Sequence, residues 1–298
     1  MADAHPVTVA SGFAFLEAPR WHEDRIWFSD FYTHQVLSAR EDGSDLRVEA
    51  RVPQQPAGLG WLPDGRLLVV SMLDRRILRR EPDGTLAVHA DLSGHATGHT
   101  NDMVLDAAGR AYVGNFGFDL MAGAPLETAS LHRVDPDGTV TEAADDLWFP
   151  NGSVITPDGV LIVNETFGNR CTAFQVTADG RLTDRHVWAQ FGALPSDRAF
   201  DKVLAQTKVA GDGACLDAEG ALWIADATGR RLLRVREGGE ITDELHPGSA
   251  VYACALGGAE GTTLYACLAP DFDATARSAA REAKLLAFRV AVPAARGI

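Results

Sequence analysis

The sequence has few cysteines and no long apolar run, and each shortage excludes a class of protein. The four cysteines show no Cys-x-x-Cys spacing, and each lies in or beside an apolar segment: Cys171, Cys215, Cys254 and Cys267. We therefore expect buried free thiols rather than a disulfide or a zinc site. No apolar run is long enough to span a bilayer, which argues against a helical membrane protein.

Positive charge is also scarce, and the net charge is −14. Nucleic acids and anionic membrane surfaces both require basic patches, so neither is an expected partner, whereas metal cations remain compatible with this charge. The first residues, MADAHPVTVASG, lack the basic start and the apolar stretch of a signal peptide. We expect a cytoplasmic protein by default, and the sequence leaves its oligomeric state open.

Helical periodicity is scarce as well, and short apolar runs separated by Asp-Gly or Glu-Gly turns take its place, which is typical of β-structure. One pattern recurs, an apolar run, a tight turn and a second apolar run: GWLPDGRLLVVSM (60–72), VLDAAGRAYVGNF (104–116), VITPDGVLIVNET (154–166) and CLDAEGALWIADA (215–227). A shorter copy spans 21–31 and a weaker one 257–269. Each copy is followed by a further apolar segment, so the chain contains six related units.

Six units of three or four strands predict an all-β fold, a six-bladed β-propeller that occupies residues 1–298 as a single domain. The segment PVTVASG (6–12) precedes the first unit, and we expect it to add the outer strand of the last blade and so close the ring. Two insertions, near 118–130 and 187–210, are candidate lids over one face, and the second contains the helix-compatible AFDKVLAQ (199–206).

Aligning the units on their first turn brings six residues into one register, which we call the anchor positions: Glu17, Ala57, Asn101, Asn151, Asp212 and Ala253. Because the innermost strand of each blade lines the central channel, all six should lie at one end of the axis. Four of them carry oxygen atoms and two of these are carboxylates. Such a set suits one hard divalent cation, Ca²⁺ first, with Mg²⁺, Mn²⁺ or Zn²⁺ as alternatives.

A purely structural interpretation competes at each position. Asn151-Gly152 and Asp212-Gly213 are ordinary turn dipeptides, and Asn101 with Asp102 could cap the start of a strand. Turn chemistry does not require Glu17, however, and it does not explain four polar residues in one register. The anchor positions therefore predict a metal site formed by Glu17, Asn101, Asn151 and Asp212.

The chain also resembles a known family. The motifs LEAPRW (16–21), TND (100–102), FPNG (149–152) and GDG (211–213) are similar to those of the SMP-30/gluconolactonase/LRE family of six-bladed propellers. The resemblance implies that Glu17 and Asn151 are metal ligands. It also implies that Asp212 both binds the metal and serves as general base or nucleophile, and that Asn101 contacts metal or substrate.

On the substrate side the resemblance is incomplete. In the regucalcin type an arginine stands two residues before the asparagine, but this chain has His99 there, which weakens the expectation of a polyhydroxylated, gluconolactone-like substrate. His99 is either a substrate contact or a rim residue, and Asp102 either supports the site or caps a strand. Phe116 and Tyr252 are further candidates to contact the substrate.

These residues predict a metal-dependent hydrolase that opens the ring of a small lactone. The cation would polarise the carbonyl group, Asp212 would activate water and Asn101 would orient the substrate. The sequence contains no Gly-x-Ser-x-Gly motif, the usual position of the nucleophile in α/β-hydrolases, so it does not indicate a serine hydrolase. Two alternatives stay open: a phosphotriesterase-like hydrolase that uses the same residues, and a propeller that binds a ligand without catalysis.

Overall fold

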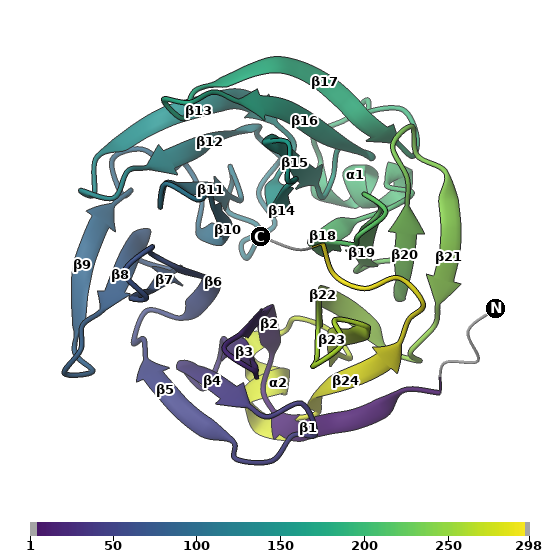
Figure 1. The fold of residues 1–298 in the computed structure, drawn as a ribbon. Helices are drawn as coiled ribbons and strands as arrows, with labels where there is room; N and C mark the ends of the chain where they lie inside the picture. The colour runs from purple at the N-terminus through teal and green to yellow at the C-terminus, as the bar shows by residue number, and fades with distance from the viewer. Residues whose placement is uncertain (1–4, 296–298) are drawn as a thin grey trace.

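The computed structural model describes residues 5–295, and nearly all of their regular structure is β-strand. The strands form six four-stranded antiparallel sheets arranged in a ring (Figure 1), which confirms the predicted six-bladed β-propeller. We predicted that the N-terminal sequence is not a signal peptide. Its first residues, 1–4, lie outside the described residues.

The first three blades use consecutive strands, and the first strand of each blade lies innermost. Blade one contains β2 (Leu16–His22), β3 (Arg25–Asp30), β4 (Gln35–Ala39) and β5 (Arg47–Arg51). Blade two contains β6 (Pro56–Trp61), β7 (Leu67–Ser71), β8 (Arg76–Arg80) and β9 (Leu86–Asp91). Blade three contains β10 (Thr100–Leu105), β11 (Ala111–Asn115), β12 (Ala129–Val134) and β13 (Val140–Leu147).

The next two blades repeat this order, and the last blade borrows a strand from the start of the chain. Blade four contains β14 (Pro150–Ile155), β15 (Val160–Glu165), β16 (Arg170–Val176) and β17 (Leu182–Gln190). Blade five contains β18 (Gly211–Leu216), β19 (Leu222–Asp226), β20 (Arg231–Val235) and β21 (Ile241–Leu245). Blade six contains β22 (Ala250–Gly257), β23 (Thr263–Ala269), β24 (Ala283–Arg289) and β1 (Val7–Phe13).

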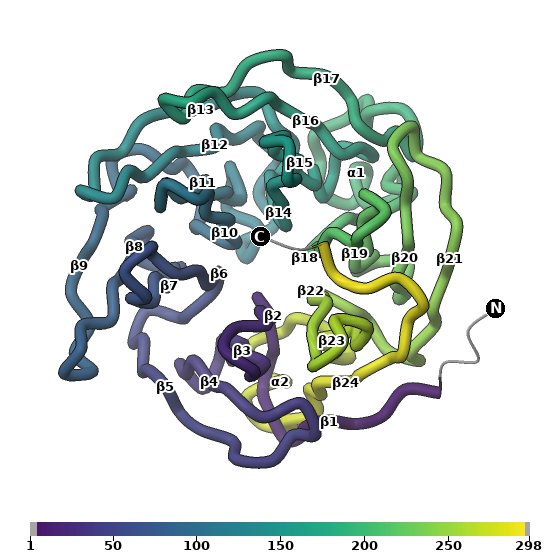
Figure 2. The backbone as a smooth tube through the Cα atoms, viewed as in Figure 1, coloured from purple at the N-terminus to yellow at the C-terminus, as the bar shows by residue number. Residues whose placement is uncertain are grey.

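The strand β1 pairs antiparallel with β24, from Val7 opposite Ala287 to Phe13 opposite Ala283. Figure 2 shows β1, in purple, running beside β24, in yellow. The predicted closure of the last blade by an N-terminal strand is therefore confirmed. Because the outer edge of β24 is covered in this way, its backbone groups are paired within the molecule.

Burial falls from the axis outward, which explains why the repeats were visible as pairs of apolar runs. Every residue of β7 and of β19 is buried, because these second strands are sandwiched between neighbouring blades. The outermost strands β13 and β17 are mainly exposed or half-buried. In blades two to five the hairpin between the first and second strands closes with glycine in the left-handed region, as at Gly65 with φ 84°, whereas in blade one Glu23 and Asp24 take this conformation.

Both predicted insertions are present, and they touch each other. The segment 199–206 forms α1 (Phe200–Gln206) as expected. The backbone N–H of Leu126, in the first insertion, donates to the carbonyl of Arg198, in the second, at 2.7 Å. A third excursion was not predicted: residues 270–282, between β23 and β24, carry α2 (Ala274–Ala280).

The four cysteines are free, as predicted, although Cys215 is half-buried rather than buried. The closest sulfur pair, Cys215 and Cys254, is 3.9 Å apart. In the part of the chain that the structure describes, neither helix has the length and apolar character needed to cross a bilayer.

Candidate active site

The six anchor positions lie in the innermost strands, each where the pairing register with the second strand of the blade is broken. The breaks recur at one level of all six blades: Glu17/Arg20, Pro56/Leu59, Thr100/Met103, Pro150/Ser153, Gly211/Ala214 and Val251/Ala253. Such irregularities re-aim a side chain away from the regular alternation of a strand. The same local distortion therefore occurs once in the inner strand of each of the six blades.

The glycines that follow two of the anchor positions serve close packing, so the turn interpretation of these dipeptides is wrong. Asn151-Gly152 lies inside β14 and Asp212-Gly213 lies inside β18. A Cβ atom on Gly152 would lie 2.3 Å from the backbone oxygen of Asp212, and one on Gly213 would lie 2.6 Å from the Cβ of Ala253. Glycine is needed here because neighbouring inner strands approach each other beside the axis.

A cavity of about 200 Å³ lies at the end of the channel where the inner strands begin, and four anchor side chains line it: Glu17, Asn101, Asn151 and Asp212. They come from β2, β10, β14 and β18. Residues more than 190 positions apart in sequence therefore face one space, as the register alignment predicted. Phe116 and Tyr252, two of the proposed substrate contacts, line the same cavity.

Most of the remaining wall is apolar. We call seven of its residues the phenylalanine cage: Phe15, Phe31, Phe116, Phe149, Phe167, Phe200 and Phe272. Phe200 belongs to α1 and Phe272 to the unpredicted excursion before α2. Only Phe116 was proposed from the sequence. Of the other four, Phe15 and Phe31 flank strands of blade one and Phe149 and Phe167 lie beside strands of blade four, so no single sequence pattern marks the cage.

A chain of hydrogen bonds links the two asparagines to the wall of the cavity. The Asn101 Nδ2 group donates to Asn151 Oδ1 at 2.9 Å, and Asn151 Nδ2 donates to Thr166 Oγ1 at 3.1 Å. The Thr166 hydroxyl then donates to the carbonyl of Gly211 at 2.9 Å. Both amides are thereby held in fixed orientations. Thr166, which lies after β15, is a member of the site that the sequence analysis missed.

The two carboxylates of the site have far fewer partners. Glu17 accepts one hydrogen bond, from the backbone N–H of Ala18 at 3.1 Å. Within residues 5–295, the buried Oδ1 atom of Asp212 accepts none. Burial raises the pKa of Glu17, and the charges of Asp212 and Asp102 raise it further. Burial and Asp102 likewise raise the pKa of Asp212. A bound divalent cation would relieve this repulsion.

The donor set fits a hard cation. Two carboxylates and two amide oxygens around one buried space are oxygen ligands of the kind that Ca²⁺ prefers. The orphaned Asp212 oxygen provides a ligand that nothing in the protein already uses. No group of three or more His, Cys, Asp or Glu side chains with metal-binding geometry occurs in the described part of the chain. A metal site in this cavity would therefore need the asparagine oxygens beside the two carboxylates.

Asp102 does not line the cavity. Its carboxylate accepts a hydrogen bond from Arg20 Nη2 at 2.6 Å and from the backbone N–H of Met103 at 2.9 Å. Arg20 also donates to the carbonyl of Met103 at 3.0 Å. The pair joins the inner strands of blades one and three, and Asp102 acts on the site through its charge.

His99 also lies outside the cavity wall. Its ring is half-buried with its centroid 5.8 Å from that of Phe116, and its backbone carbonyl accepts the N–H of Phe116. Burial lowers the pKa of His99, which favours the neutral ring at neutral pH. The structure thus places His99 behind a residue that lines the cavity.

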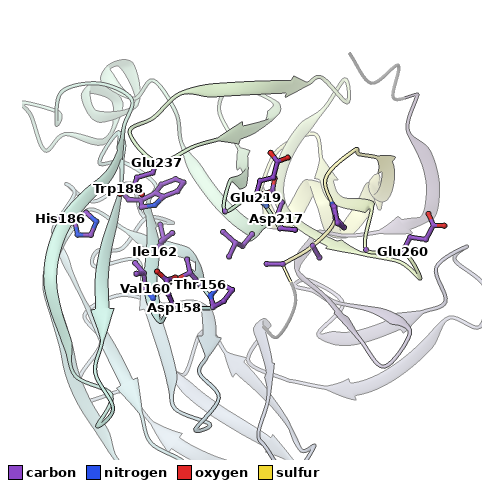
Figure 3. A pocket seen from close by; sticks show the side chains of 18 of the residues that line it. Thr156, Asp158, Val160, Ile162, His186, Trp188, Asp217, Glu219, Glu237 and Glu260 are labelled. Atoms are coloured by element: carbon purple, nitrogen blue, oxygen red, sulfur yellow. Dashed lines mark hydrogen bonds between the residues drawn. The ribbon is translucent and has the colours of Figure 1, made fainter.

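A larger hollow of about 1050 Å³ lies at the opposite end of the channel, where hairpin turns of blades four, five and six meet residues 293–295 (Figure 3). Acidic side chains there are compensated: Arg234 pairs with Asp217 at 2.7 Å and with Glu219 at 2.8 Å. No anchor residue lines this hollow. We therefore assign the candidate site to the smaller cavity.

Comparison with known proteins identifies the family of the chain and several relatives. A family model described as SMP-30/gluconolactonase/LRE-like region matches residues 15–269. A pentonolactonase of Haloferax volcanii is 27% identical over 254 residues, 84% of this chain and 79% of that protein. Regucalcin of Danio rerio is 27% identical over 216 residues, 72% of this chain and 66% of that protein. A calcium-binding regucalcin structure from Agrobacterium tumefaciens has a TM-score of 0.73 at 18% identity, covering 97% and 96% of the two chains, and so shares the fold.

Proposed function

The chain belongs to the SMP-30/gluconolactonase/LRE-like family, and we propose that it is a lactonase, an enzyme that hydrolyses a cyclic ester to the open-chain hydroxy acid. The observation that carries the proposal is the unpaired, buried Oδ1 atom of Asp212, in a cavity that also receives Glu17, Asn101 and Asn151. The pentonolactonase relative supports the reaction class.

We propose that Glu17, Asn151 and Asp212 hold one divalent cation, with Asn101 completing or orienting the set. The oxygen donors favour Ca²⁺, and the relatives named regucalcin, one of them described as calcium-binding, support that choice. When bound, such a cation polarises the substrate carbonyl and stabilises the charge that develops on its oxygen.

Asp212 is the proposed general base. One oxygen of its carboxylate would hold the cation, and the other accepts a proton from water while the water oxygen bonds to the carbonyl carbon of the lactone. The bond between that carbon and the ring oxygen then breaks, and the proton passes from Asp212 to the ring oxygen. The product is one hydroxy acid, with no atom gained beyond those of water.

The other residues position the substrate. Asn101 is held by its hydrogen bond to Asn151, so its amide offers a fixed polar surface toward the ring. Tyr252 lines the cavity with its ring centroid 4.6 Å from that of Phe15. Burial raises the pKa of Tyr252, so its hydroxyl stays protonated and can donate to a substrate oxygen.

Lactone hydrolysis followed by proton release, with Ca²⁺ or with EDTA, tests the proposal. We expect turnover to require the cation and to fall by about 10²–10⁴-fold in Asp212→Asn, the range for loss of a general base. Asp83→Asn, in an exposed hairpin, is the matched control and should keep full activity. Undiminished hydrolysis by Asp212→Asn would remove Asp212 from the mechanism.

A further inference from the structure

The walls of the cavity are lined by aromatic rings in contact with one another. Within the phenylalanine cage, ring centroids are 4.4 Å apart for Phe116 and Phe149, 5.4 Å for Phe149 and Phe167, and 5.6 Å for Phe167 and Phe200. Blades three and four and the helix α1 contribute to this one run of rings. Such walls offer apolar contact and no hydrogen-bond partners.

Several polar groups of the wall are already engaged with each other, and the Tyr252 hydroxyl is left for one substrate oxygen. Asn101, Asn151 and Thr166 form the chain of hydrogen bonds that ends on Gly211. The Tyr32 hydroxyl donates to the carbonyl of Phe272 at 2.6 Å. A sugar lactone carries a hydroxyl on nearly every ring carbon, and those that face the phenylalanine cage would lose water without gaining a partner. Unpaired buried hydroxyls are costly, so this cavity disfavours such a ring.

The cavity also lacks a group for binding an anionic substituent. None of the described residues that line it is lysine, arginine or histidine. His99 lies behind Phe116, and Arg20 is engaged by Asp102. The proposed cation would be held by the two carboxylates and occupied by the ester carbonyl, so a carboxylate or sulfonate elsewhere on the substrate would find no basic side chain as a counter-ion. The substituents of the substrate should therefore be neutral.

The dimensions and the mouth of the cavity narrow the choice further. An apolar cavity of about 150 Å³ takes up a benzene-sized molecule, so the ≈ 200 Å³ available here accommodates one small ring with a short substituent. Three large apolar side chains of the wall are exposed to solvent at its mouth: Met121 at 52%, Phe272 at 45% and Leu204 at 36%. An incoming molecule meets apolar surface before it meets the carboxylates.

We propose that the substrate is a small neutral lactone whose ring carries an alkyl or aryl group, and that the phenylalanine cage binds that group while the ester faces the anchor residues. This inference rests on the proposed lactonase activity and adds the substrate class. The polar and apolar halves of the cavity then serve different parts of one molecule.

A matched set of lactones tests the proposal in the calcium-loaded protein. The set contains δ-valerolactone, its derivative with a butyl group beside the ring oxygen, and glucono-δ-lactone. We expect kcat/KM for the butyl derivative to exceed that for the unsubstituted ring by at least about tenfold, and that for glucono-δ-lactone by at least about 100-fold. Equal or faster hydrolysis of glucono-δ-lactone would overturn the proposal.

Two variants locate the preference in the cage. Phe200→Asn and Phe272→Ser should each lower the ratio of kcat/KM between the butyl and unsubstituted lactones by about tenfold. The control is Leu46→Ser, because Leu46 is 47% exposed, close to the 45% of Phe272, but does not line the cavity. It should leave the ratio unchanged. A ratio unaffected by both cage variants would contradict the assignment.

A binding measurement separates this proposal from the lactonase proposal. Isothermal titration with the butyl-substituted δ-valerolactam and with a polyhydroxylated lactam uses ligands that stay intact. We expect binding of the butyl lactam only. If Asp212-dependent hydrolysis is found solely for glucono-δ-lactone, the substrate class is wrong and the lactonase proposal stands. If no lactone is hydrolysed, the lactonase proposal is wrong, and the titration alone decides whether the cage selects apolar rings.

Discussion

Two sets of buried acidic residues occur at neighbouring levels of the propeller, and they have opposite environments. At the anchor level, Glu17 and Asp212 are each 8% exposed; Glu17 accepts one backbone hydrogen bond, and the buried Oδ1 atom of Asp212 accepts none from the described residues. One level away, at the ends of the second strands, Asp30 and Asp226 are 1% and 0% exposed and are fully partnered. Burial alone does not distinguish the two sets.

The partnered acids hold the segments that lead into the inner strands. Asp30 accepts the backbone N–H groups of Ala14 and Phe15 at 3.1 and 3.0 Å. Asp226 accepts that of Ala210 at 3.0 Å and pairs with Arg231 at 2.8 Å. Among residues 5–295, no lysine, arginine or histidine forms an ion pair with Glu17 or Asp212. We infer that the fully hydrogen-bonded acids stabilise the fold, and that Glu17 and Asp212 bind a ligand.

The largest expected effect that separates the two sets is on activity. Glu17→Gln should lower kcat/KM for a lactone by at least about 100-fold, because it removes a carboxylate from the proposed cation site. The free energy of unfolding in EDTA should stay the same or rise, since the change removes repulsion from Asp212. Urea unfolding in EDTA measures this free energy. A clear loss of stability would show that Glu17 stabilises the fold as Asp30 and Asp226 do.

The reverse experiment uses a partnered acid. Asp226→Ala should lower the free energy of unfolding by about 3 kcal/mol, because it leaves the Ala210 N–H unpaired and breaks the ion pair with Arg231. The protein that remains folded at low temperature should keep most of its calcium affinity. Urea unfolding and isothermal titration with Ca²⁺ provide the two readings, and a stable variant that cannot bind Ca²⁺ would reverse the inference.

Calcium should stabilise the protein only through the unpartnered acids. At about 100 times its dissociation constant, Ca²⁺ should add about 2.7 kcal/mol to the free energy of unfolding, and EDTA should remove it. The same addition should leave Glu17→Gln almost unchanged. Thermal unfolding monitored by circular dichroism measures the effect. If Ca²⁺ raised the unfolding temperature of the unchanged protein and of Glu17→Gln equally, Glu17 would not be a ligand of the cation.

The smallest effect concerns the glycines that let the anchor strands approach. Gly152→Ala should lower the free energy of unfolding by about 1–3 kcal/mol through overpacking, because the new Cβ atom would lie 2.3 Å from the backbone oxygen of Asp212. Gly94→Ala is the control: nothing lies within 4 Å of its Cβ position, and the change should be neutral or stabilising. Urea unfolding compares the two, and equal stability would show that the strands can move apart.

The sequence was sufficient for the blades and for the anchor set, because both repeat in the chain with a recognisable register. Glu17 and Asp212 could be aligned from their spacing to the next turn. The sequence could not show that Asp102 is engaged by Arg20, since the two are 82 residues apart and meet only when blades one and three surround the axis. A contact between blades depends on ring geometry, which no local pattern encodes.

The phenylalanine cage escaped prediction for a related reason. Phe149 follows a buried tryptophan and Phe31 an acidic residue, so each looks like an ordinary core position in its own blade. Phe272 lies in an excursion that no periodicity marked, because α2 is only seven residues long. Their common function arises from convergence on one cavity, and it is visible only when the side chains are placed.

The pairing of β1 with β24 also determines when the site can exist. Val7 pairs with Ala287, 280 residues further along the chain, so this contact has one of the largest sequence separations in the molecule. Non-local pairings of this kind form late because a long loop must close first. Glu17 follows β1 directly, and Tyr252 belongs to the blade that β1 completes. The cavity should therefore be assembled in a late folding step, because Glu17 and Tyr252 reach their final positions only when the ring closes.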